Sequence, residues 1–112
     1  MNETYYIYGL IDPSTKELRY VGRTSNFKAR ISYHKRLKFH SGTAERREWF
    51  DQMRERNQEP EVIVLDVCQG EDMAYRLEGV WMVDMAKSGF NLTNFIWPDY
   101  HRIFGIAFQG KA

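Results

Sequence analysis

The sequence predicts an α+β domain in which a small three-stranded, mainly antiparallel sheet is flanked by helices in the order ββααβα. Aromatic and β-branched segments alternate with segments whose apolar residues recur every three or four positions. A short turn separates the first two strand-like segments, which is typical of an antiparallel hairpin, and a long crossover leads to the third. With 112 residues, 43% of them hydrophobic and 28% charged, the chain fits one globular core.

The three strands are expected at residues 4–11, 18–23 and 61–67. The first segment is rich in Tyr and Ile, and turn-forming residues 12–17 join it to the second. The third segment contains the continuous apolar run Val62-Ile63-Val64-Leu65. Such a run is typical of a strand that is covered on both faces, so the third strand is expected at the centre of the sheet.

Two helices are expected between the second and third strands. Ser25-Asn26 can cap the first helix, whose apolar residues extend to Leu37. Ser41-Gly42-Thr43 ends that helix and can cap the next, which is expected over residues 44–56. The apolar side of the second helix is formed by Trp49, Phe50 and Met53.

A third helix is expected to open at Gly70-Glu71-Asp72, where early acidic residues suit the helix dipole. Its apolar stripe is formed by Ala74, Leu77, Trp81 and Met85, and Gly89 is expected at its C-terminal cap. Residues 1–94 are therefore expected to form one domain. Residues 95–112 are expected to be an aromatic C-terminal extension that packs on the domain or in an interface.

Composition excludes several classes of protein. Cys68 is the one cysteine, so no internal disulfide can form, which fits a reducing, cytoplasmic location. No apolar run approaches the roughly 20 residues that a membrane helix needs, and the first residues do not resemble a secretory signal.

Charge is segregated along the chain although the net charge is only +1. Residues 16–47 sum to +8 and residues 48–84 to −7. The basic segment can form a face that docks a polyanion through phosphate contacts. The alternative is two solvated faces that pair with each other.

Four places combine polar and aromatic side chains in a way that a core alone does not require. The strands carry Tyr6-Ile7-Tyr8 and Tyr20-Val21-Gly22. The first helix has Arg30 and His34 four residues apart, and therefore on one face. Glu78 lies at the edge of the apolar stripe of the third helix, which is followed by Phe90-Asn91.

This ordered set resembles the GIY-YIG nuclease family over about residues 4–94. Tyr6-Ile7-Tyr8 stands where the family has Gly-Ile-Tyr, with Tyr6 in place of the glycine, and Tyr20-Val21-Gly22 stands where it has Tyr-Ile-Gly. The resemblance also assigns family roles to other positions. These are the helix arginine (Arg30), the histidine of an Arg-x-x-x-His pair (His34), the metal-binding glutamate (Glu78) and the aromatic-Asn pair (Phe90-Asn91).

The resemblance implies a divalent-metal-dependent DNA endonuclease domain that hydrolyses phosphodiester bonds. Glu78 offers a hard oxygen ligand for Mg²⁺, with Mn²⁺ as a substitute, and a single carboxylate is enough when water supplies other ligands. The planar guanidinium of Arg30 can hold two phosphate oxygens as charge builds on them. Additional contacts to the nucleic acid are expected from Arg23, Lys28, Lys35, Arg36 and Asn91.

A tyrosine is expected to activate the attacking water, although its reference pKa is about 10. Nearby cations favour the phenolate, and Tyr8 and Tyr20 are the candidates. They share a face of the sheet if the hairpin pairs residues of like parity. Tyr8 is favoured as the base, with Tyr20 positioning it. Arg23 and His34 are expected to contact the phosphate or to orient the water.

The same residues also allow other interpretations. Each tyrosine taken singly suits sheet packing, and each charged residue suits a solvated face. A catalytically inactive nucleic-acid-binding module of the same fold is the alternative function, and a partner-binding role for the aromatic extension is a third. DNA is the expected partner, together with a homodimer, a separate DNA-binding domain or a partner chain.

Overall fold

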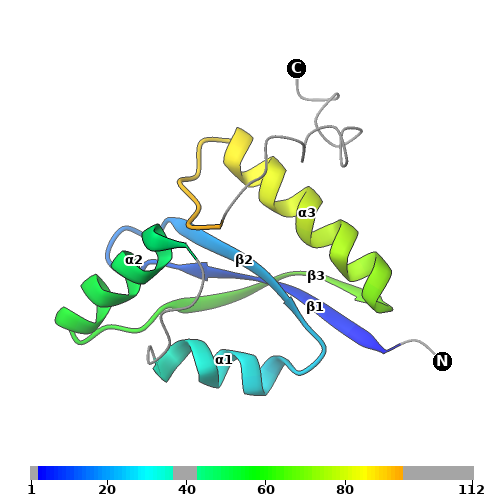
Figure 1. Cartoon of the computed structure of the whole chain (residues 1–112), viewed down its shortest axis with the longest axis horizontal. Helices are drawn as coiled ribbons and strands as arrows, with labels where there is room; N and C mark the ends of the chain where they lie inside the picture. Colours follow the sequence, from blue (N-terminus) through cyan, green and yellow to red (C-terminus); the bar gives the residue numbers. More distant parts are fainter. Residues whose placement is uncertain (1–2, 37–42, 95–112) are drawn as a thin grey trace.

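The computed structural model describes residues 3–36 and 43–94, and it confirms the predicted α+β class and the order ββααβα (Figure 1). The elements are β1 (Thr4–Ile11), β2 (Leu18–Thr24), α1 (Phe27–Arg36), α2 (Ala44–Glu55), β3 (Glu61–Gln69) and α3 (Glu71–Lys87). The predicted end of α1 at Leu37, the Ser41-Gly42 break and the 95–112 extension lie outside the described residues. No helix in the described ranges is both long and apolar enough to cross a membrane.

The three strands form one antiparallel sheet in the order β2-β1-β3. The prediction that the third strand is central is therefore wrong, because β1 is central and β3 is an edge strand. Ile63, Val64 and Val67 of β3 are 40–50% exposed. Hydrophobicity of consecutive residues indicates burial only statistically, and strand order depends on contacts that are remote in sequence.

Helices cover both faces of the sheet. Figure 1 shows α1 and α2 on one side and α3 on the other. Because side chains alternate along a strand, Tyr8 and Leu10 of β1 pack with Trp49 and Met53 of α2. Ile7 points to the opposite face, where it belongs to the cluster that includes residues of α3. The stripe predicted for α3 lies in this second cluster.

The helix ends use the residues that the sequence suggested. The side-chain oxygen of Asn26 accepts the Ala29 N–H at the start of α1, and Thr43 caps α2 in the same way through Arg46 N–H. At the end of α3, Gly89 adopts φ +102°, and the Phe90 N–H donates to the Met85 carbonyl. This left-handed cap satisfies carbonyls of the last turn, as predicted for Gly89.

After α3 the chain returns to the open edge of β2. The Thr93 N–H donates to the Arg19 carbonyl at 2.6 Å. The Asn94 side-chain amide then pairs with the backbone of Val21, accepting from its N–H at 2.9 Å and donating to its carbonyl at 2.8 Å. Asn94 thus acts as a short piece of neighbouring strand and fixes α3 against β2.

Candidate active site

A polar cavity of about 380 Å³ lies where α1 and α3 approach β2 from opposite faces of the sheet. Tyr20 and Arg23 differ in parity and point to opposite faces. β2 is an edge strand, and within the described residues Thr93 and Asn94 pair with its open edge at Arg19 and Val21, so that Tyr20 and Arg23 can both line one cavity. The lining comprises Tyr5, Tyr20, Arg23, Thr24, Ser25, Arg30, Glu71 and Glu78. A larger cavity of about 560 Å³ at the start of α3 contains neither Tyr20, Arg30 nor Glu78.

Glu78 enters the cavity from α3 and pairs with Arg23. The Arg23 Nη1 lies 2.5 Å from the Glu78 Oε1, and the side chains are 32% and 16% exposed, respectively. Arg23 also lies over the ring of Tyr75, 5.4 Å from its centroid. Burial raises the pKa of Glu78, while the charges of Arg23 and Arg30 oppose this shift. The ionised form of the Glu78 carboxylate is thus stabilised by nearby positive charge, which Arg23 and Arg30 supply in this structure.

Arg30 reaches the cavity from the first turns of α1, where its side chain is exposed. It lies beside Tyr33, with 5.8 Å between the guanidinium carbon and the ring centroid. A guanidinium that is both exposed and at the cavity is available to an incoming anion. The structure thus brings Tyr20, Arg23, Arg30 and Glu78 to one place, from three elements.

Tyr8 and His34 form a buried pair behind this cavity. The Tyr8 hydroxyl lies 2.7 Å from the His34 Nε2, and the two residues are 1% and 3% exposed. Burial, followed by the neighbouring Tyr20, raises the pKa of Tyr8. Burial and the charges of Arg30 and Arg46 lower the pKa of His34 to about 4. Neither side chain lines the cavity.

The hairpin register confirms that Tyr8 and Tyr20 share a face. Tyr8 pairs with Gly22 and Leu10 pairs with Tyr20, and the two phenol rings are 6.1 Å apart. Gly22 is required by this arrangement. A Cβ at Gly22 would lie 2.6 Å from the Tyr8 hydroxyl oxygen and 2.8 Å from Cε2 of Tyr20.

Gly22→Ala is expected to displace both rings, destabilise the fold by about 1–3 kcal/mol and reduce catalysis beyond that loss. The measurement is urea unfolding together with plasmid nicking at a temperature where the variant stays folded. Gly9→Ala is the matched control, because its Cβ meets mainly the flexible end of Leu18 at 2.5 Å. Equal nicking by folded Gly22→Ala and wild-type protein would contradict the role given to this glycine.

Burial of neutral His34 gives stability a defined pH dependence. Between pH 6.5 and about 4 the unfolded chain binds a proton at this residue that the folded protein does not bind. The free energy of unfolding should therefore fall as pH decreases through this window, by about 2–3 kcal/mol between pH 7 and 4.5 from this residue. Urea unfolding of wild type and His34→Gln at both pH values tests this, since carboxylate contributions are common to both. Identical pH dependence would refute it.

The remaining predicted contacts to nucleic acid are spread more widely. Lys28 is exposed on the first turn of α1, and Lys35 and Arg36 belong to its last turn. Asn91 is exposed beyond the end of α3, where its backbone carbonyl accepts a hydrogen bond from Arg19 Nε at 2.7 Å. The cavity lining includes neither Lys28 nor Asn91, and the contacts of all four residues to nucleic acid stay predictions.

Sequence reasoning missed two residues that shape the site. The Arg46 guanidinium lies over the ring of Tyr20, 4.7 Å from its centroid, and Asn94 fixes the β2 backbone next to that tyrosine. The signal that could have indicated Asn94 is its amide side chain, close to Asn91 in the sequence. An amide offers one donor and one acceptor and can therefore pair with the backbone of an edge strand, as a neighbouring strand would. Nothing in the spacing of α2 distinguishes Arg46 from Arg47.

The fold and this cavity define a class: a small α+β domain in which a tyrosine, two arginines and a glutamate line one cavity at the edge of a three-stranded sheet. Residues 4–91 match the family described as the GIY-YIG catalytic domain. The chain belongs to this family, and its function is therefore of the nuclease type. No curated protein and no solved structure matches the chain.

Proposed function

We propose that the chain is a DNA endonuclease domain that hydrolyses phosphodiester bonds with the help of one divalent cation. The observation that carries this proposal is the convergence of Tyr20, Arg30 and Glu78 on one polar cavity. Hydrolysis of a phosphodiester needs an activated water, neutralisation of the phosphate and stabilisation of the leaving oxygen. These three residues offer one group for each requirement.

Arg30 is assigned to the scissile phosphate. Its exposed guanidinium can donate to two phosphate oxygens at once, and this interaction strengthens as negative charge develops in the transition state. Arg23 lines the same cavity and can add a contact from the other face of the sheet. Two arginines on opposite sides of one cavity suit a bound phosphate better than a neutral substrate.

Tyr20 is assigned to the attacking water, which its hydroxyl oxygen orients and activates. Its position in the cavity lining supports this role. The sequence favours Tyr8 as the base, but its 1% exposure and raised pKa support a positioning role instead. In this proposal the Tyr8–His34 hydrogen bond fixes the Tyr8 ring, which supports Tyr20 from behind.

Glu78 is assigned to Mg²⁺ or Mn²⁺. The described residues contain no group of three or more His, Cys, Asp or Glu side chains that could hold a metal by themselves. The half-buried Glu78 carboxylate in the lining of a polar cavity, with the exposed Glu71 in the same lining, instead suits a hydrated cation, which binds through one or two carboxylates and the substrate phosphate. When bound, the cation would neutralise charge on the phosphate and stabilise the leaving oxygen.

A plasmid-nicking assay with and without chelator tests the proposal. Supercoiled DNA should be converted to open circles with Mg²⁺ or Mn²⁺ and should stay intact with excess EDTA. Retention of DNA on a gel without any conversion, with metal present, would support the inactive binding module instead. Nicking that persists in EDTA would contradict the role assigned to Glu78.

A further inference from the structure

We infer that Arg23 is the counter-ion of Glu78 in the metal-free protein and that a divalent cation must displace it. Arg23 would then be a competitor of the metal, not a residue that prepares its site. This inference rests on the proposed function, because it takes Glu78 as the metal ligand. The site would then have two states. In the metal-free state Arg23 pairs with Glu78, and in the metal-bound state the released guanidinium can bind the phosphate.

The contact between the two side chains is close and exclusive. Arg23 Nη1 lies 2.5 Å from Glu78 Oε1, and Arg23 is the only hydrogen-bond partner of this carboxylate within residues 3–36 and 43–94. Glu78 is 16% exposed. An unpaired carboxylate at such a position is costly, so removal of Arg23 without replacement should destabilise the domain.

Competition follows from charge. A guanidinium and a dication that bind the same partly buried carboxylate repel each other, because screening is weak away from water. Arg23 has room to leave, since its side chain is 32% exposed and lines the cavity. Its contact with the Tyr75 ring, at 5.4 Å, is a cation–π interaction that tolerates sliding of the guanidinium across the ring.

If Arg23 helped Glu78 to bind the metal, its neutralisation would change the metal affinity in the opposite direction. If Arg23 only orients Glu78, with the other carboxylate oxygen left for the metal, then neutralising Arg23 should weaken metal binding. If Arg23 competes, the same change should strengthen it. The sign of the effect on metal affinity therefore separates the two roles without any measurement of cleavage.

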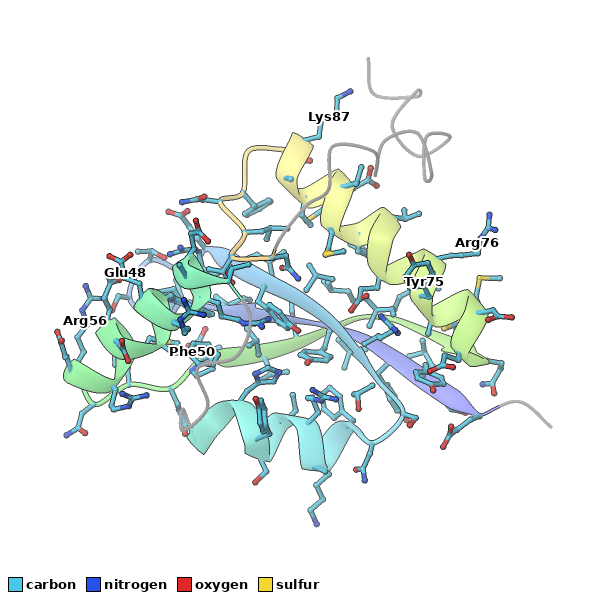
Figure 2. All side chains as sticks on the ribbon, viewed as in Figure 1. Glu48, Phe50, Arg56, Tyr75, Arg76 and Lys87 are labelled. Atoms are coloured by element: carbon cyan, nitrogen blue, oxygen red, sulfur yellow. The ribbon has the colours of Figure 1, made fainter. Side chains whose placement is uncertain are left out.

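The experiment is a titration of the DNA-free protein with Mn²⁺, followed by electron paramagnetic resonance of the free ion. Arg23→Gln removes the charge but keeps an amide donor for Glu78, and we expect it to bind Mn²⁺ about tenfold more tightly than wild type. Arg76→Gln is the matched control. It removes one positive charge from α3, two residues from Glu78, where Arg76 is exposed and points away from the sheet (Figure 2). Its affinity should stay within about twofold of wild type.

Glu78→Gln separates failure of this inference from failure of the proposed function. If Glu78→Gln binds Mn²⁺ as wild type does, Glu78 is not the ligand, and both proposals fall. If Glu78→Gln loses the site but Arg23→Gln binds no more tightly than wild type, only the displacement of Arg23 is refuted. If Arg23→Gln folds too poorly for the titration, thermal melting of a second variant, Arg23→Met, with and without Mn²⁺ measures metal binding through the shift in Tm. Its metal-induced rise in Tm should exceed that of wild type, and an equal or smaller rise would overturn the inference.

Discussion

Glu78→Gln is expected to reduce nicking on the order of a thousandfold while leaving the fold intact. The substitution keeps the shape of the side chain but removes the charge that would hold the cation, and such a cation supplies several kcal/mol to the transition state. Arg23 loses its partner, but its partial exposure allows water to solvate it. Initial rates of nicking at saturating Mg²⁺, with circular dichroism to check the fold, give the measurement.

Glu71→Gln is the matched control for Glu78→Gln. Both glutamates belong to α3 and line the same cavity, but Glu71 is exposed in the first turn and Glu78 is paired with Arg23. Glu71→Gln should therefore stay within a few-fold of wild type. A loss of the same size in both variants would mean that the negative charge of the cavity matters as a whole, which contradicts the single-ligand assignment.

Arg30→Ala should lower kcat about 10²–10³-fold with little change in stability. The size follows from removal of a preorganised donor that acts on charge developing in the transition state. Stability should change little because Arg30 is exposed and the helix gains a residue of high propensity. Single-turnover cleavage of a short duplex separates kcat from binding.

Lys28→Ala provides the comparison on the same helix. Lys28 is exposed two residues before Arg30 but does not line the cavity. Its loss should weaken DNA binding slightly and reduce the dependence of affinity on salt, with kcat unchanged. If Arg30→Ala affects only binding, as Lys28→Ala should, then Arg30 is a docking residue and has no part in the transition state.

Local rules predicted most of the elements in this chain. The aromatic and β-branched run of β1 matches its predicted bounds of residues 4–11, and Thr43 caps α2 as expected. These features depend on residues within a few positions of one another. By contrast, the shared face of Tyr8 and Tyr20 depends on a register shift that the turn does not determine. Ile11 pairs with Leu18 next to the turn, and the shift between Leu10 and Ile11 brings Leu10 opposite Tyr20.

Features set by long-range contacts were not predictable in this way. The apolar run of β3 suggested a central strand, yet its pairing with β1 alone leaves Val64 half exposed. The side chains of Arg30 and His34 are four residues apart, but one is exposed at the cavity and the other is buried against Tyr8. Helical spacing gives a shared face and does not say how deep each residue lies.

The convergence of the site also depends on topology. Arg23 and Tyr20 point to opposite faces of β2, and they meet only because β2 is at the edge of the sheet. Had β2 been central, a neighbouring strand would have separated them. The order β2-β1-β3 is thus the feature of the fold that allows a glutamate of α3 and an arginine of α1 to serve one substrate.

The most direct measurement is a crystal structure of the protein with Mn²⁺ and a short DNA duplex, in which anomalous scattering locates the ion. The central claim is that one cavity holds the cation, the phosphate and the water-activating tyrosine. We predict an anomalous peak at the Glu78 carboxylate and a backbone phosphate between Arg30 and Tyr20. A peak at Glu71 and Asp72 with none at Glu78, or a phosphate bound away from Arg30, would contradict the claim.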